Sequence, residues 1–146
     1  MAYTDIDKPT DYFETVLYAG NAGTQSITSL DFQPDWVWCK ERGTVDDGSG
    51  NDTHAVFDSV RGATKRLIPN GTNAEGTQSN GITSFNSNGF TSGDANITNG
   101  GSSRTYASWN WKAGTSFTND ASGTGIGSID STGSVNTDAG FSIVSY

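Results

Sequence analysis

The stretch TYASWNWKAG, residues 105–114, alternates strictly between two sets of side chains. Ala107, Trp109 and Trp111 would share one face of an extended chain, and the even-numbered residues between them would share the other. A period of two is that of a β-strand, because a helix repeats every 3.6 residues. Similar alternation at residues 12–18, 35–42 and 53–60 predicts further strands.

The residues around these runs favour an all-β fold. The 146-residue chain has 19 glycines, and Leu17, Leu30 and Leu67 are its only leucines, so good helix formers are scarce. Four Trp, seven Phe and five Tyr supply enough apolar surface to argue against disorder. We expect an antiparallel β-sandwich of lectin-like or jelly-roll type with long Gly/Ser/Asn-rich loops.

Three segments are expected along the chain. Residues 1–11 form an N-terminal lead-in, and residues 12–114 form the β-sandwich repeat unit. Residues 115–146 are a Gly/Ser/Thr-rich connection, either a linker or a run of weak edge strands, followed by the start of a second unit. The second unit is inferred because GFSIVSY (140–146) matches YFETVLY (12–18) at three of seven positions.

Charge narrows the partners that the chain can bind. The net charge is −8 and the pI is near 4.3, so the surface should repel nucleic acid and anionic lipid. No apolar run approaches the length of a membrane span, and membrane insertion is not expected. Cys39 is the single cysteine and is expected to be a small buried residue.

The residues offer little support for catalysis or metal binding. His54 is the only histidine, and Asp58 on the same strand face would be about 13 Å away along the strand. Asp46, Asp47 and Asp52 could flank a glycosidase site or a calcium loop, but they lie in one Gly-rich loop that is better explained as a solvated turn. We therefore expect no enzyme activity, no catalytic or metal-binding residues and no cofactor.

Three basic residues lie close together in RGATKRL, namely Arg61, Lys65 and Arg66. Two interpretations have equal weight. The cluster can be a solvated loop that offsets nearby acidic residues, or it can be a docking patch for an acidic neighbouring subunit.

The tryptophans also allow two interpretations. Trp36 and Trp38 form one W-x-W pair, and Trp109 and Trp111 form another, so each pair would present two rings on one face. Such rings could stack on sugars. Val37 and Cys39 flank the first pair with apolar cover, and a leucine-poor chain has few other large residues to bury. We therefore expect all four to be core aromatics.

Several motifs resemble one known family when they are taken together and in order. They are LYAGNAGTQSITSLDFQPDWVWCKER (17–42), HAVFDSVRGATKRL (54–67), SFNSNGFTSG (84–93), TYASWNWKAG (105–114) and AGFSIVSY (139–146). The set resembles an uncharacterised repeat found in predicted tail-fibre and other virion proteins of marine tailed bacteriophages. Asp31 departs from the family, which often has Gly there.

The resemblance implies a lectin-like, all-β virion component. The expected function is that of a structural protein in a tail fibre or a capsid-attached decoration, which serves assembly and host-facing display. The alternative is a glycan-binding module for host recognition. The expected partners are other virion proteins, further copies of the chain (a trimer is favoured) and host surface glycans, with localisation in the virion.

Overall fold

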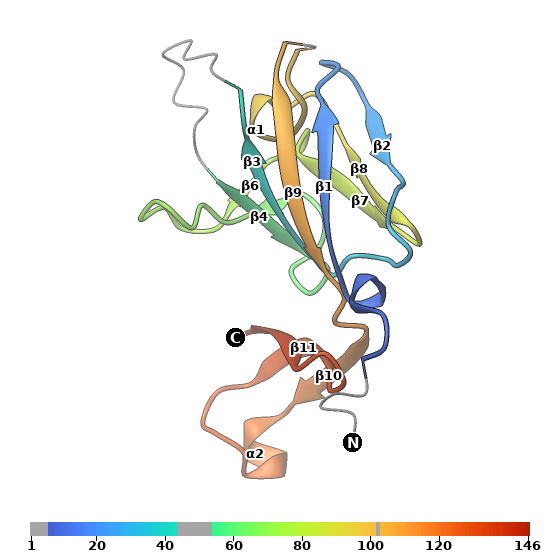
Figure 1. Cartoon of the computed structure of the whole chain (residues 1–146). Coiled ribbons are helices and arrows are strands. Elements are labelled where there is room, and N and C mark those ends of the chain that lie inside the picture. Colours follow the sequence, from blue (N-terminus) through green and yellow to red (C-terminus); the bar gives the residue numbers. More distant parts are fainter. Residues whose placement is uncertain (1–5, 44–53, 102) are drawn as a thin grey trace.

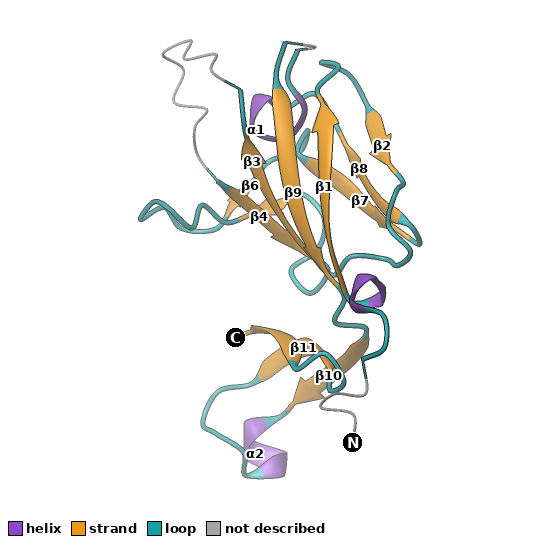
Figure 2. Ribbon diagram, viewed as in Figure 1, coloured by secondary structure: helices purple, strands orange, loops and turns teal. Residues whose placement is uncertain are grey.

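In a computed structural model, which describes residues 6–43, 54–101 and 103–146, nearly all regular structure is antiparallel β-sheet (Figure 2). The all-β prediction is confirmed. The strands are β1 (Phe13–Ala19), β2 (Gln25–Ile27), β3 (Trp36–Glu41), β4 (Ala55–Asp58), β5 (Lys65–Arg66), β6 (Gly76–Thr77), β7 (Ile82–Asn86), β8 (Gly89–Ser92), β9 (Thr105–Trp111), β10 (Thr115–Asn119), β11 (Ser131–Asn136) and β12 (Phe141–Ser145). The helices are short: η1 (Pro9–Asp11), α1 (Asn96–Asn99) and α2 (Ala121–Thr124).

Two of the sheets form the sandwich (Figure 1). One has the order β1-β9-β3-β4 and the other the order β2-β8-β7. Their facing sides meet in one core cluster, which consists of Ile27, Val37, Cys39, Ala55, Phe57, Ile82, Phe90, Ala95 and Ile97. The β-sandwich prediction is therefore confirmed.

Strand β9 lies between β1 and β3 and turns its polar residues inward. Tyr106, Ser108 and Asn110 are buried on the core side. The Asn110 amide donates to the carbonyls of Glu14 (3.0 Å) and Ser108 (3.2 Å), which partly satisfies a polar group in the interior. The opposite side of β9 is left for its two tryptophans.

The prediction that the tryptophans are core residues is wrong. Trp36, Trp38, Trp109 and Trp111 are only half-buried and lie outside the core cluster, on the outer face of the four-stranded sheet. Their strand neighbours Val37 and Cys39 are fully buried. The reason is that successive side chains point to opposite faces, so the residues that alternate with the tryptophans face the second sheet.

The segment FQPD, which precedes β3, ties three parts of the chain together. Phe32, Pro34 and Asp35 are buried. The Asp35 carboxylate accepts from the Ser59 hydroxyl and from the Ala113 backbone N–H, both at 2.8 Å. These charge-assisted bonds connect the start of β3 to the residues that follow β4 and β9.

Two connections between strands differ from what the sequence predicts. The sequence of residues 82–94 predicts two short strands around an Asn88–Gly89 turn. The hairpin is present, but its two loop residues are Ser87 and Asn88, because Asn86 pairs with Gly89. Gly89 has φ +149°, and a Cβ there would lie 1.8 Å from the Ile27 carbonyl oxygen, so only glycine fits. The sequence SVRGATKRL (59–67) could form one helical turn, but this segment makes hydrogen-bonded turns and the short strand β5 instead.

Residues 115–145 form their own three-stranded sheet, β10-β11-β12, which lies below the sandwich in Figure 1. The segment therefore forms strands and not an open linker, although β11 lies in the middle of this sheet and not at an edge. Phe141 at the start of β12 contacts Trp111 (ring centroids 6.0 Å apart) and Trp36 (6.4 Å). That Phe141–Tyr146 opens a second repeat unit stays a prediction.

The two faces of the large sheet should respond differently to truncation. Phe57 is fully buried in the core, so Phe57→Ala should lower the free energy of unfolding by about 3–5 kcal/mol. Leu17 lies on the outer face of the same sheet and is 60% exposed, so Leu17→Ala should change it by less than about 0.5 kcal/mol. Urea denaturation followed by far-UV circular dichroism measures both, and a larger cost for Leu17→Ala would contradict the assignment of the core face.

Candidate binding site

The outer face of the four-stranded sheet carries two rows of aromatic side chains. The strand register places Phe13, Trp111 and Trp36 side by side across β1, β9 and β3. The next row on the same face has Thr15, Trp109 and Trp38. Both W-x-W pairs therefore meet on one surface, although they lie about 70 residues apart in the sequence.

The first row is partly covered by neighbouring rings. Phe13 packs against Trp111 with ring centroids 4.7 Å apart, and Phe141 stacks on Trp111 at an interplanar angle of 21°. Phe141 also meets Trp36 edge-on. The C-terminal sheet thus docks on the lower end of the aromatic face.

The second row remains open and forms a pocket of about 370 Å³ lined by Trp38, His54, Trp109 and Trp111, called here the tryptophan pocket. Trp38 and Trp109 meet edge to face, with centroids 6.1 Å apart and an interplanar angle of 66°. The rings therefore form angled walls instead of a flat layer. A hollow of this volume with aromatic walls is typical of a small-ligand site.

His54 fixes one wall of the tryptophan pocket. Its Nδ1 accepts a hydrogen bond from the Trp38 indole N–H at 2.8 Å, and the two rings meet at 65°. Because an indole N–H can only donate, the neutral imidazole must carry its own hydrogen on Nε2. The ring therefore retains one hydrogen-bond donor for a ligand.

The environment of His54 favours its neutral form. Burial lowers the pKa of His54 below its usual value of 6.5, and the positive charge of Lys40 lowers the pKa further. The hydrogen bond from Trp38 acts in the same direction, because it requires an unprotonated Nδ1.

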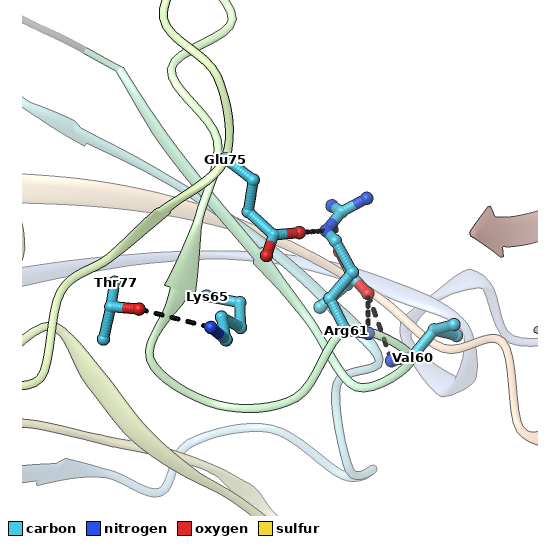
Figure 3. A network of polar contacts seen from close by, with 6 residues as sticks. Val60, Arg61, Lys65, Glu75 and Thr77 are labelled. Carbon is cyan, nitrogen blue, oxygen red and sulfur yellow. Dashed lines mark hydrogen bonds and ion pairs between the residues drawn. The ribbon is translucent and has the colours of Figure 1, made fainter. Parts of the chain in front are cut away.

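The predicted basic patch is engaged in contacts within the chain, as Figure 3 shows for Arg61 and Lys65. The Arg61 guanidinium pairs with the fully buried Asp58 carboxylate and lies 3.7 Å from Glu75. Lys65 donates to the Thr77 hydroxyl at 3.2 Å, and Arg66 donates to the Gln78 side chain at 2.8 Å. These contacts fit the interpretation that the three basic residues compensate nearby acidic and polar side chains. A docking role for the three residues stays a prediction.

The other residues considered for chemistry are not brought together. His54 binds Trp38, whereas Asp58 binds Arg61 and the backbone N–H groups of Val60 and Arg61. Asp46, Asp47 and Asp52 lie outside the described residues. Within the described ranges, no group of three or more His, Cys, Asp and Glu side chains is placed to hold a metal ion.

The single cysteine is buried, as the sequence predicts. Cys39 is fully buried, and burial raises the pKa of its thiol to about 12, so the thiol is inert at neutral pH.

Among the residues that the structure describes, no helix is long and apolar enough to cross a membrane.

A polar hollow of about 460 Å³ lies in the C-terminal sheet and includes Asp120 and Asp130. Both carboxylates have local partners. Asp120 accepts from the Ser122 hydroxyl and the Gly123 N–H, and Asp130 accepts from the Ala121 N–H at 2.9 Å. They hold the short helix α2 in place, so the tryptophan pocket is the stronger candidate site.

The comparison with known families now identifies the chain. Residues 8–146 match DUF7483, a domain of unknown function. The chain belongs to this family. The match includes β10, β11 and β12, so the family spans both the sandwich and the C-terminal sheet. No curated protein and no solved structure matches the chain.

Sequence reasoning identified the aromatic residues but assigned them to the wrong side of the sheet, and it missed His54 as a pocket residue. The signal that could have found the pocket is the pattern of two W-x-W strands, each with small or polar residues at the alternate positions. Their pairing is a long-range property of the fold.

The contact between Trp38 and His54 should depend on pH. His54 is the only histidine, so its ring signals in NMR are unambiguous, and we expect them to titrate with a pKa below 6.5. Since the folded-state pKa is lowered, the stability from this contact is present above pH 6.5 and is lost as pH falls through the folded pKa. His54→Phe should remove this component of the pH dependence in urea unfolding. An NMR titration midpoint of His54 at or above pH 6.5 would contradict the prediction.

Proposed function

We propose that this DUF7483 domain is a glycan-binding module whose tryptophan pocket receives a sugar ring. The observation that carries the proposal is the outward placement of Trp38, Trp109 and Trp111 around one open pocket. Large aromatic side chains at the surface are costly to hydrate, and a ligand that covers them recovers apolar burial.

A sugar suits this pocket better than a purely apolar ligand. The C–H face of a sugar ring can pack on an indole, while its hydroxyl groups bond to polar groups at the rim. His54 Nε2–H is one such donor, and Thr15 lies beside Trp109 on the neighbouring strand. The angled walls formed by Trp38 and Trp109 fit a ring that enters by its edge.

The biological setting of the proposal rests on the resemblance to repeats of phage virion proteins. In that setting the domain would be displayed on a tail fibre or a capsid decoration and would bind host surface glycans. The arrangement of the molecule is compatible with display, because the tryptophan pocket lies on the outer face of the sheet and the C-terminal sheet contacts only its lower end.

Removal of one pocket wall should weaken glycan binding. Trp109→Ala should weaken binding to a glycan selected from an array at least tenfold, which corresponds to about 1.4 kcal/mol, whereas Trp109→Phe should keep part of the affinity. The measurement is a titration of tryptophan fluorescence, with circular dichroism as the check on folding.

Tyr146→Ala is the matched control, because Tyr146 is an exposed aromatic residue outside the tryptophan pocket. Equal losses in Trp109→Ala and Tyr146→Ala would indicate general adhesion by surface rings. Absence of binding to every glycan on the array would overturn the proposal.

A second candidate function, assembly of a virion fibre, is favoured by the C-terminal sheet. Strand β12 is an edge strand, with Val144 46% exposed near its end. An open edge strand with exposed apolar residues is a template for pairing with another chain.

Self-assembly can be measured directly by size exclusion with light scattering on residues 1–146. We expect a trimer or a larger assembly, and Val144→Lys should shift it toward the monomer because a charged side chain blocks edge pairing. Ile126→Lys, at a loop residue that is 69% exposed, serves as the control for added charge. A monomeric wild-type chain would count against this second function.

A further inference from the structure

Two basic residues stand apart from the other six in this acidic chain. Lys8, Arg61 and Arg104 form ion pairs, Lys65 and Arg66 donate hydrogen bonds, and Lys112 lies over the Tyr12 ring. Lys40 and Arg42 have no ion pair, side-chain hydrogen bond or ring contact with another described residue. Among the described residues, no carboxylate neutralises these two side chains, so their positive charge can act on a ligand.

Both bases belong to the face that carries the tryptophan pocket. Strand alternation places Lys40 on the same side of β3 as Trp38, about 7 Å further along. Arg42 follows at the next position of that face, where its N–H donates to the Thr105 carbonyl at 2.7 Å. The two cations therefore continue the line of the pocket toward one end of β3.

The residues around Lys40 leave room for a ligand and connect it to the pocket. Lys40 is in register with Ala107, a small residue where the next rows have tryptophans. Since Cys39 pairs with Ala55, the next position across the two strands puts Lys40 beside His54. The influence of the Lys40 charge on His54 agrees with this placement.

We propose that the tryptophan pocket binds an acidic sugar, with its ring against Trp38 and Trp109 and its carboxylate on Lys40 and Arg42. This inference rests on the proposed glycan-binding function and names its ligand class. An ammonium or guanidinium group forms stronger hydrogen bonds with a carboxylate than with a hydroxyl, and the adjoining indoles reduce screening by water. His54 Nε2–H can bond to a hydroxyl on the same ring.

The test compares each acid with its own neutral ester. Short oligomers of mannuronate, guluronate, galacturonate and glucuronate are titrated against the full chain, each beside its methyl ester, with tryptophan fluorescence as the readout. At least one acid should bind about tenfold more tightly than its ester. That advantage should shrink as salt rises toward about 1 M, where the Debye length is about 3 Å.

Substitutions of Lys40 and Arg42 test whether these two residues cause the preference for the acidic sugar over its ester. Lys40→Met and Arg42→Met should each reduce the ratio of acid to ester affinity and leave the affinity for the ester unchanged. Lys65→Met changes the net charge equally, but Lys65 lies on β5, away from β3, and donates to the Thr77 hydroxyl, so this control should keep the wild-type ratio.

The outcomes separate this inference from the function on which it rests. Equal affinity for acid and ester in every pair, with binding still lost in Trp109→Ala, would overturn the acidic-sugar inference and leave glycan binding intact. Absence of binding to any sugar would overturn both. Tighter binding of a single-stranded oligothymidylate than of any acidic sugar would overturn the inference in favour of a nucleic-acid ligand, because nucleobases also stack on indole rings.

Discussion

The alternation of side chains along β9 is the constraint on which the rest of the structure depends. This strand lies between β1 and β3, so its register decides which residues of all three strands face the second sheet. Tyr106, Ser108 and Asn110 face inward, and Trp109 and Trp111 face outward. A slip by one residue would exchange the two sets, which would turn two indoles toward the filled core and would expose the hydrogen bonds of Asn110.

The same constraint produces a surface that is unusual for a small domain. The core is built largely from medium-sized residues and two phenylalanines, while the largest side chains of the central strands remain half-exposed. Phe13 and Phe141 cover one row of these rings, and the other row stays open. The C-terminal sheet thus limits the aromatic face to a pocket of small-ligand size.

Charge on this surface follows a similar division. Glu41, which faces the inner side of the sheet, forms a buried pair with Arg104 at 2.7 Å, so its charge is neutralised there. On the outer side, Lys40 follows Trp38 on the face of β3 that carries the tryptophan pocket. The buried ion pair and the proposed ligand contacts therefore lie on opposite faces of β3, because successive residues of a strand point in opposite directions.

The sequence by itself determined the fold class, most of the strand positions and the fact that each W-x-W pair shares a face, because all three follow from local composition and a period of two. It also marked the β7–β8 hairpin, although not its loop residues. Alternation cannot show which of two faces becomes the core.

Only the tertiary structure decided that question, through the packing of β2-β8-β7 against the side of the large sheet that carries Val37 and Cys39. The hydrogen bond from Trp38 to His54 and the stacking of Phe141 on Trp111 likewise join residues that are far apart in sequence or on different strands. Such contacts depend on register and sheet packing, and no local pattern of residues contains that information.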